Sequence, residues 1–154
     1  MESYEVDGRF VLDDTAGHPD SLQATFDVAA MLVRPLAMAG RRMVVVYALR
    51  GRRGEDINRR NARTLADLAA EHGVRSLVIT ASADVAGPLD MATAGEIDAS
   101  RETFDSRGQP IEWYDDLRAA VRAAMDLTTA GDLIVLVGAQ GMNEGKALLQ
   151  DAGS

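Results

Sequence analysis

Short apolar runs that alternate with helical patterns constrain the fold of this chain more than any other feature. Met43–Leu49 is nearly continuous and rich in β-branched residues, and Phe10–Leu12, Ser76–Thr80 and Leu133–Val137 have the same character. Strands covered on both faces show such runs, whereas strands with one wet face alternate apolar and polar residues. This order of strands and helices predicts a three-layer α/β sandwich with a mostly parallel sheet and right-handed crossovers.

The segments around these runs predict the remaining elements. Tyr4–Val6 and Arg9–Leu12 flank Asp7-Gly8, which indicates a possible N-terminal β-hairpin. Ile111–Tyr114 predicts a further short strand. Four helical segments are predicted. The first begins at Pro19, has apolar residues up to Val33 and Leu36, and ends or kinks at Arg34-Pro35. The second continues through Ala62 to a C-cap at His72-Gly73, with His72 in a structural role. The third lies between Asp90 and Phe104 with Glu96 on its wet side, and the fourth covers Leu117–Met125 and is capped by Asp115-Asp116.

Length and composition limit the classes of function. A chain of 154 residues predicts one domain, residues 1–154, and its formal net charge of −8 disfavours nucleic acid or an anionic membrane as a partner. Cysteine is absent and only His18 and His72 are histidines, so no metal site is expected. No apolar run approaches the roughly 20 residues that span a bilayer, and the acidic N-terminus is unlike a signal peptide. A cytoplasmic location is expected.

The stretch Phe10–Leu22 predicts a strand that ends at an acidic pair and turns directly into a helix. Asp13 and Asp14 follow the apolar run, Gly17 permits a tight turn, and Pro19 suits the first helical turn. One interpretation is a well-capped connection. The other is a ligand crevice at the carboxyl end of a parallel sheet, where open α/β folds bind small molecules.

An arginine-rich loop follows the strongest predicted strand. The segment 50–63 holds six of the 16 basic residues of an acidic chain: Arg50, Arg52, Arg53, Arg59, Arg60 and Arg63. Guanidinium groups suit bidentate contact with phosphate or carboxylate, and the glycines at 51 and 54 let the backbone turn sharply. The alternatives are a bound anion and a solvated loop whose arginines pair with Glu55 and Asp56.

Two more loops end predicted strands with polar or small residues. Ser82 and Asp84 could bond a ligand hydroxyl or amine, although turn chemistry explains them equally well. The segment Gly138–Lys146 resembles a phosphate-binding P-loop but lacks its spacing, because Gln140 stands at a required glycine and Ala147 follows the lysine. Backbone groups around Gly138, Gln140 and Gly141 are further ligand candidates. Too few residues follow Lys146 for a full helix.

Three pieces in this order resemble the C-terminal domain of the Mur ligase family, also called the glutamate ligase domain. They are the Asp-Asp-x-x-x-x-Pro-Asp-Ser turn into a helix, the arginine and glycine-rich loop, and Gly-Asp-Leu-Ile-Val-Leu-Val-Gly-x-x-Gly at residues 131–141. The resemblance extends from about Tyr4 to Leu149. It implies a Rossmann-like domain that closes over a central ATPase domain in ligases that join amino acids to a carboxylate, in peptidoglycan precursors, folates or polyamino acids.

The resemblance implies roles for some residues. Asp14, Gly17 and His18 would bind nucleotide near its ribose and base, and Arg50, Arg52 and Arg53 would face phosphate or a substrate carboxylate. The signature Asp-Asn-Pro-Arg of the members that add a diamino acid is absent, and Ala81-Ser82-Ala83-Asp84 stands in its place. The family usually has His or Asn where Gly17 stands, and His18 follows one place later. ATP and Mg are the implied cofactors.

The chain is expected to need a partner for catalysis. It has no Walker lysine loop and its only lysine is Lys146, so the N-terminal and central ATPase domains are absent from it. No residue of this chain is assigned a catalytic role, and the expected partner is a Mur-type ATPase domain, fused or separate. The alternative function is a non-catalytic nucleotide- or amino-acid-binding regulatory domain. A signalling receiver domain lacks support because no phosphoacceptor Asp follows the central strand.

Overall fold

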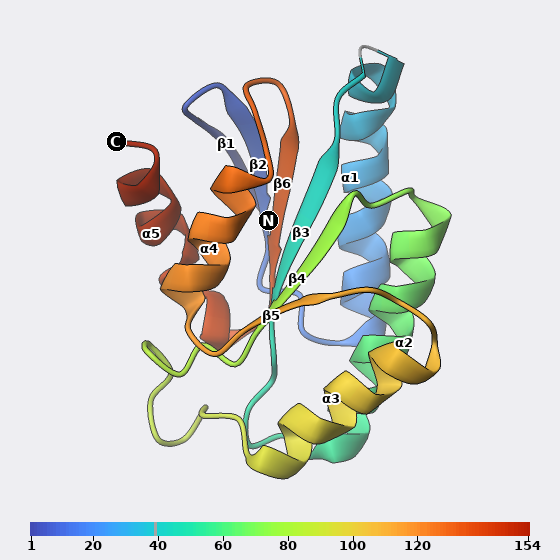
Figure 1. The fold of residues 1–154 in the computed structure, drawn as a ribbon, viewed down its shortest axis with the longest axis vertical. Coiled ribbons are helices and arrows are strands. Elements are labelled where there is room, and N and C mark those ends of the chain that lie inside the picture. The colour runs from blue at the N-terminus through green and yellow to red at the C-terminus, as the bar shows by residue number, and fades with distance from the viewer. Residues whose placement is uncertain (39) are drawn as a thin grey trace.

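The chain folds around one six-stranded sheet, shown in Figure 1. The computed structural model describes residues 1–38 and 40–154. The sheet has the order β1-β2-β6-β3-β4-β5. Its strands are β1 Glu2–Val6, β2 Arg9–Asp13, β3 Met43–Ala48, β4 Ser76–Thr80, β5 Glu112–Tyr114 and β6 Leu133–Val137. The helices are α1 Pro19–Met38, α2 Glu55–Glu71, α3 Ala94–Ser106, α4 Leu117–Asp126, α5 Gly145–Ala152 and the short 3-10 turn η1 Gln140–Met142.

Pairing in the sheet is parallel except at one edge. The strands β2, β6, β3, β4 and β5 pair in parallel with their neighbours, and only β1 runs antiparallel, against β2. The turn between β1 and β2 places Asp7 at φ 47° and Gly8 at φ 75°, the left-handed values that a two-residue hairpin turn requires. The predicted hairpin and the mostly parallel sheet are confirmed.

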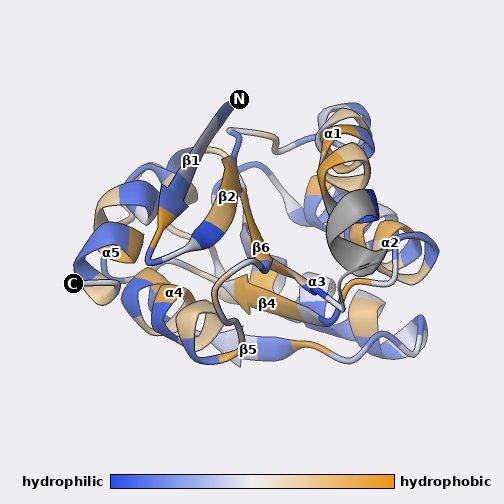
Figure 2. Ribbon diagram, turned by 90° about the horizontal axis from the view of Figure 1, so that it is seen from above, coloured by the Kyte–Doolittle hydropathy of each residue, from blue (hydrophilic) through white to orange (hydrophobic). Residues whose placement is uncertain are grey.

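Helices cover both faces of the sheet and leave an apolar core on each side. One core joins α1, α2 and Phe104 of α3 to the face with Val45, Tyr47 and Val135. The other joins α4 and α5 to the opposite face with Val46 and Ile134. Figure 2 shows the mostly hydrophobic strands β2, β4 and β6 between helices that carry both hydrophilic and hydrophobic residues. Because both faces are covered, all six residues of β3 are buried, which confirms the three-layer sandwich predicted from its apolar run.

The helix that starts at Pro19 runs further than predicted. It continues through Pro35 to Met38, so of the two outcomes expected at Arg34-Pro35, an end or a kink, the end is wrong. Proline removes one helical N–H, whose acceptor would have been the carbonyl of Met31. The side chain of Met31 is 73% exposed, so water can reach this part of the helix and satisfy that carbonyl. Val33 and Leu36, predicted on the buried side, lie outside the side chains that the structure describes.

Three details at other helix ends differ from the sequence prediction. Glu96, expected on the wet side of α3, is only 2% exposed. It belongs to a capping box with Thr93, which begins the helix. Asp116 is the N-cap residue of α4, but its side chain makes no capping hydrogen bond. After residue 144 the chain still forms α5, a helix of eight residues, where no full helix was expected.

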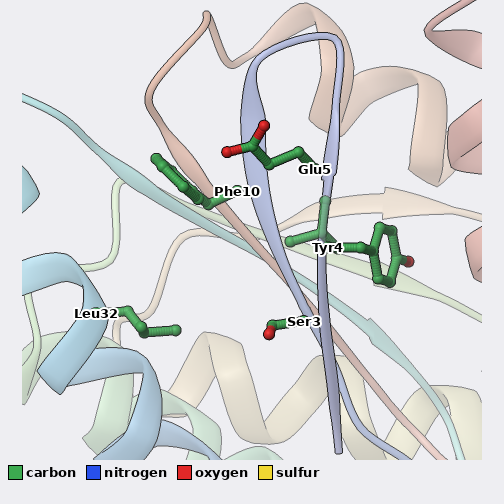
Figure 3. Close-up of a pocket in the computed structure, with 6 residues that line it drawn as sticks. Ser3, Tyr4, Glu5, Phe10 and Leu32 are labelled. Atoms are coloured by element: carbon green, nitrogen blue, oxygen red, sulfur yellow. The ribbon is translucent and has the colours of Figure 1, made fainter.

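An apolar groove of about 340 Å³ lies between the hairpin and α1, lined by Ser3, Tyr4, Glu5, Phe10, Val11 and Leu32. Figure 3 shows Phe10 and Leu32 on the same side of the hairpin, while Tyr4 points to the other side. The groove lies beside the first residues of β2, away from the end where the parallel strands finish. Among the helices that the structure describes, none combines the length and the apolar character needed to cross a membrane.

Candidate functional site

The candidate site is the edge of the sheet at which the parallel strands end, here called the carboxyl edge. Because β2, β3, β4 and β6 are parallel, the loops that follow them leave the sheet at the same edge. Every sequence-predicted site residue lies in these four loops or at their start: Asp14, Gly17, His18, Arg50, Arg52, Arg53, Ser82, Asp84, Gly138, Gln140 and Gly141. The candidate residues of all four loops therefore lie at the same edge of the sheet.

The turn after β2 is fixed by side chains from two helices. Asp14 Oδ2 accepts a hydrogen bond from the hydroxyl of Thr25 at 2.6 Å. The carbonyl of Gly17 accepts one from Asn61 Nδ2 at 2.9 Å, and the N–H of His18 donates to Ser21 Oγ at 3.1 Å. The position of this turn is therefore set by α1 and α2, while the His18 side chain stays exposed.

The Arg50 side chain makes its contacts with the turn after β2. Its Nη1 donates to His18 Nε2 at 3.0 Å and lies 3.4 Å from the carbonyl oxygen of Gly17. Because a guanidinium group can only donate, Nε2 of His18 is the acceptor and the ring proton sits on Nδ1. A Cβ at Gly17 would lie 2.8 Å from Arg50 Cδ, so the glycine lets the arginine pass closely over the turn.

The backbone of residues 50–54, here called the arginine loop, holds an anion that the chain itself supplies. The N–H groups of Arg52, Arg53 and Gly54 donate to the carboxylate of Glu96 at 3.0, 2.9 and 2.8 Å. Burial alone would raise the pKa of Glu96, but hydrogen bonds from Thr93 and from the N–H groups of Gly54 and Arg52 lower it below its ordinary value. The backbone amides of this loop are therefore occupied by an internal carboxylate, and binding of an external anion by the arginine side chains stays a prediction.

The side chains of Arg52 and Arg53 remain available at the surface. They line an open depression of about 710 Å³ together with Pro88, Leu89, Asp90 and Gln140, here called the arginine depression. Arg53 Nη2 lies 3.7 Å from Asp90 Oδ1, and its side chain is 42% exposed. The structure thus brings Gln140, a candidate from the last loop, to the two arginines.

Ser82 and Asp84 have structural contacts. Both carboxylate oxygens of Asp84 cap α4, accepting from the N–H groups of Leu117 at 2.7 Å and Arg118 at 3.1 Å. Ser82 is fully buried, has φ 53°, and its N–H donates to Thr80 Oγ1 at 2.9 Å. The Ser82 contact is local turn chemistry, whereas the Asp84 contacts cap a helix that begins 33 positions later.

The two glycines after β6 pack against the end of β3. A Cβ at Gly138, which has φ 123°, would lie 2.4 Å from the carbonyl oxygen of Ala48. A Cβ at Gly141 would lie 3.0 Å from Ala48 Cβ. Close packing of the last loop on the neighbouring strand therefore requires glycine at 138 and a small residue at 141.

A second depression, of about 300 Å³, separates this loop from the end of β2. It is lined by Met1, Glu2, Asp13, Asp14, Thr15, Gly138, Ala139, Met142, Asn143 and Lys146, and is here called the acidic depression. Burial raises the pKa of Asp13, although the hydroxyl of Tyr4 donates to its Oδ2 at 3.2 Å. Lys146 pairs with Glu2 and lies 4.8 Å from the centre of the Tyr4 ring.

Sequence reasoning missed the buried polar residues that hold these loops. Glu96 follows the capping-box pattern Thr93-x-x-Glu96, which was available as a signal. Asn58 accepts from Arg50 N–H at 3.2 Å and donates to Arg50 O at 2.9 Å. Asn58 and Asn61 share the buried side of α2 with Leu65, so their helical spacing was the second available signal.

The fold and this edge define a Rossmann-like α/β domain with ligand-accessible loops at the carboxyl ends of parallel strands. The family model for the Mur ligase glutamate ligase domain matches residues 1–140. The chain belongs to this family. The resemblance seen in its sequence motifs is confirmed.

Solved structures show the same fold. A murein peptide ligase from Psychrobacter arcticus superposes with a TM-score of 0.70 at 19% identity, covering 100% of this chain and 30% of that one. A domain from a protein named as a UDP-N-acetylmuramate:L-alanyl-gamma-D-glutamyl-diaminopimelate ligase of Haemophilus ducreyi gives 0.61 at 21% identity, covering 98% of both chains. A bifunctional folylpolyglutamate synthase/dihydrofolate synthase from Yersinia pestis, complexed with AMPPNP and Mn, gives 0.59 at 13% identity, covering 96% of this chain and 28% of that one.

The chain spans less than a third of two of these three solved proteins. No curated protein matches it.

Proposed function

We propose that this chain is the C-terminal lobe of an ATP-dependent ligase that joins an amino acid to a carboxylate. The match of residues 1–140 to the Mur ligase glutamate ligase domain carries this proposal. In this proposal, a separate central ATPase domain holds the nucleotide and the incoming amino acid, and this chain closes over them. The chain is either fused to that domain or a separate subunit, and the ligase works in the cytoplasm. The four loops at the carboxyl edge form the surface that closes.

The turn after β2 and the acidic depression have the chemistry for the nucleoside part of ATP. Asp14 lines the depression, and its carboxylate can accept hydrogen bonds from ribose hydroxyls. His18 is exposed beside the same turn, and its Nε2 is already occupied by Arg50, so Nδ1 carries the proton that it can donate. We assign Asp14, Gly17 and His18 to nucleotide contact and Arg50 to holding His18.

The arginine depression has the chemistry for an anionic group. Arg52, Arg53 and Gln140 surround it, and guanidinium groups bind carboxylate or phosphate through paired hydrogen bonds. Among the described residues that line it, Asp90 alone carries a carboxylate, and this group lies 3.7 Å from Arg53. We assign Arg52 and Arg53 to a phosphate of the nucleotide or the carboxylate of a substrate.

ATP supplies the phosphoryl group that activates the carboxylate when it is bound by the complete ligase. Within residues 1–38 and 40–154, no group of three His, Asp or Glu side chains is placed to hold a metal ion. The residues present therefore do not fit a magnesium site of their own, and we assign Mg and the phosphate cradle to the central domain. This chain contributes binding and exclusion of water around the reacting groups.

The test is ATP-dependent amide formation by this chain together with the Mur-type ATPase domain to which it belongs. Mass spectrometry identifies the amide across a panel of carboxylates and amino acids, and release of ADP is followed in parallel. Arg53→Gln should lower the rate by about tenfold or more, because a charge-assisted contact is lost. The matched control is Arg60→Gln on the exposed side of α2, which should stay within about twofold of the parent rate.

Absence of both amide formation and association with the ATPase domain would contradict the proposal. Calorimetry with ATP, ADP and amino acids then identifies the alternative. Binding of one of these ligands without ligase activity would indicate a regulatory domain that has kept the fold.

A further inference from the structure

Glu96 is a buried carboxylate with an unusually complete set of donors. Its side chain is 2% exposed. Oε1 accepts from the N–H groups of Arg53 and Gly54, at 2.9 and 2.8 Å. Oε2 accepts from the N–H groups of Arg52 at 3.0 Å and Thr93 at 2.8 Å, and from the Thr93 hydroxyl at 3.2 Å. Among the side chains that the structure describes, no other one connects the loop after β3 to the start of α3 through so many hydrogen bonds.

The arginine loop has the backbone form of an anion-binding nest. Arg52 has φ 61° and Gly54 has φ 101°, and the three successive N–H groups of residues 52–54 point at one carboxylate. Such concave sets of amides bind phosphate or other anions in many proteins. A non-glycine residue at positive φ, such as Arg52, needs surrounding contacts to hold it there. Here Glu96 supplies them.

The loop is also held from its other side. A Cβ at Gly51 would lie 1.9 Å from the carbonyl oxygen of Asp90 and 2.5 Å from the nitrogen of Ala92. The arginine loop is thus packed directly on the backbone of the loop that follows β4. Its backbone is enclosed between that loop and Glu96, while the side chains of Arg52 and Arg53 point outward into the arginine depression.

We propose that Glu96 is a positioning residue for the arginine depression: its carboxylate takes the place of an external anion in the amide nest of residues 52–54, and so holds Arg52 and Arg53 toward an anionic ligand. An anion at this edge is then bound by guanidinium groups and not by backbone amides. The link to a ligand rests on the proposed function, whereas the role of Glu96 in the loop does not.

The first test compares Glu96→Gln with the parent chain, and uses Glu102→Gln, an exposed residue of the same helix, as the matched control. Amide hydrogen exchange measured by NMR should become at least about tenfold faster at residues 52–54 in Glu96→Gln and stay unchanged in Glu102→Gln. Inorganic phosphate is the ligand probe, followed by the side-chain Nε–H signals of Arg52 and Arg53. Its affinity should fall about fivefold or more in Glu96→Gln.

The second test is chemical rescue. Glu96→Ala leaves the nest amides without a carboxylate, and added formate should restore slow exchange at residues 52–54, whereas chloride at the same ionic strength should not. A residue that only fills space would not be replaced by a small anion. The proposal is overturned if exchange is unchanged in Glu96→Gln, if formate gives no rescue, or if phosphate does not reach Arg52 and Arg53 in the parent chain.

A third measurement uses the parent chain and so does not depend on a variant that folds. The carboxyl carbon signal of Glu96 is titrated with acid while the amide signals of residues 52–54 are followed. The charged groups around this site are Glu55, whose Oε2 lies 2.8 Å from the Cβ position of Gly95, together with the side chains of Arg52, Arg53 and Asp90. The chemical shifts of these amides should change over the same pH range as the carboxyl signal of Glu96, and this range should lie below the ordinary pKa of glutamate. Movement with Glu55 or Asp90 would overturn the proposal.

These measurements need neither nucleotide nor partner. If no ligase activity is found but the amides of residues 52–54 respond to Glu96 as expected, the proposed function is wrong and the role of Glu96 stands. If ligase activity is found but these amides do not respond to Glu96, only the role of Glu96 is wrong.

Discussion

Arg50 Nη1 and His18 Nε2 lie 3.0 Å apart, and this contact joins the loops that follow β2 and β3. The two residues are 32 positions apart in the sequence, and β6 separates their strands in the sheet. The same guanidinium group passes over Gly17, which has no side chain to obstruct it. Two of the four loops at the carboxyl edge therefore act as one unit, and the orientation of His18 depends on Arg50.

Arg50→Lys should destabilise the protein by about 1 kcal/mol, because an ammonium group cannot reproduce the fork that reaches His18 and Gly17 while Arg50 is partly buried. Urea unfolding measures the change. Arg60→Lys, at an exposed position, is the control and should stay within about 0.5 kcal/mol of the parent. Equal stability of both variants would show that the Arg50 contact contributes nothing.

The cap of α4 comes from Asp84, not from the residue that precedes the helix. Asp84→Ala should cost about 1 kcal/mol of stability because two helix N–H groups lose their acceptor. Asp116→Ala, the matched change at the N-cap position, should cost less than about 0.5 kcal/mol since its side chain makes no cap bond. Thermal unfolding of the two variants decides between them. The reverse order would contradict the assignment.

Gly138 is required by packing. Gly138→Ala should destabilise the protein by about 2 kcal/mol or more, because its φ is 123° and a Cβ would lie 2.4 Å from the carbonyl oxygen of Ala48. Gly87 has open space around its Cβ position, so Gly87→Ala should leave stability within about 0.5 kcal/mol. Denaturant midpoints of both variants provide the comparison. A neutral Gly138→Ala would show that the turn adapts without cost.

Asp132 should make stability depend on acid pH. Its carboxylate is 1% exposed; burial raises its pKa, but N–H groups of Thr129 and Arg42 and the charge of Arg42 lower it below the ordinary 3.8. A lowered pKa means that the folded state favours the charged form, so the stabilisation is full above the unfolded value and disappears as pH falls through the folded value. Asp132→Asn should therefore cost about 2 kcal/mol at about pH 7, and this cost should shrink as pH falls below the unfolded value and through the folded one.

Urea unfolding of Asp132→Asn and the parent at three values of pH tests this dependence. If the loss of stability in Asp132→Asn is the same at neutral and acid pH, the charge of Asp132 does not cause it, and altered packing or hydrogen bonding does. Asp126→Asn, at an exposed position in the last turn of α4, is the control for loss of a surface carboxylate.

Much of the fold was predictable because strands buried on both faces need continuous apolar residues. Met43–Leu49 and Leu133–Val137 could not be solvent-facing segments, and Asp7-Gly8 has the conformational freedom that a two-residue hairpin turn demands. The end of α1 was not predictable in the same way. Local preference places a helix end before Pro35, yet the helix continues to Met38.

The sequence by itself determined the apolar runs, their order, the family to which the chain belongs, and the presence of polar residues after each parallel strand. Only the tertiary structure decided which of those polar residues face solvent and which serve the protein itself. Asp84 caps a helix that begins 33 positions later, and Glu96 fills a nest formed by residues 52–54. Hydrogen-bond partners so far apart in sequence leave no local pattern, because they meet only when the parallel strands bring their ends to one edge.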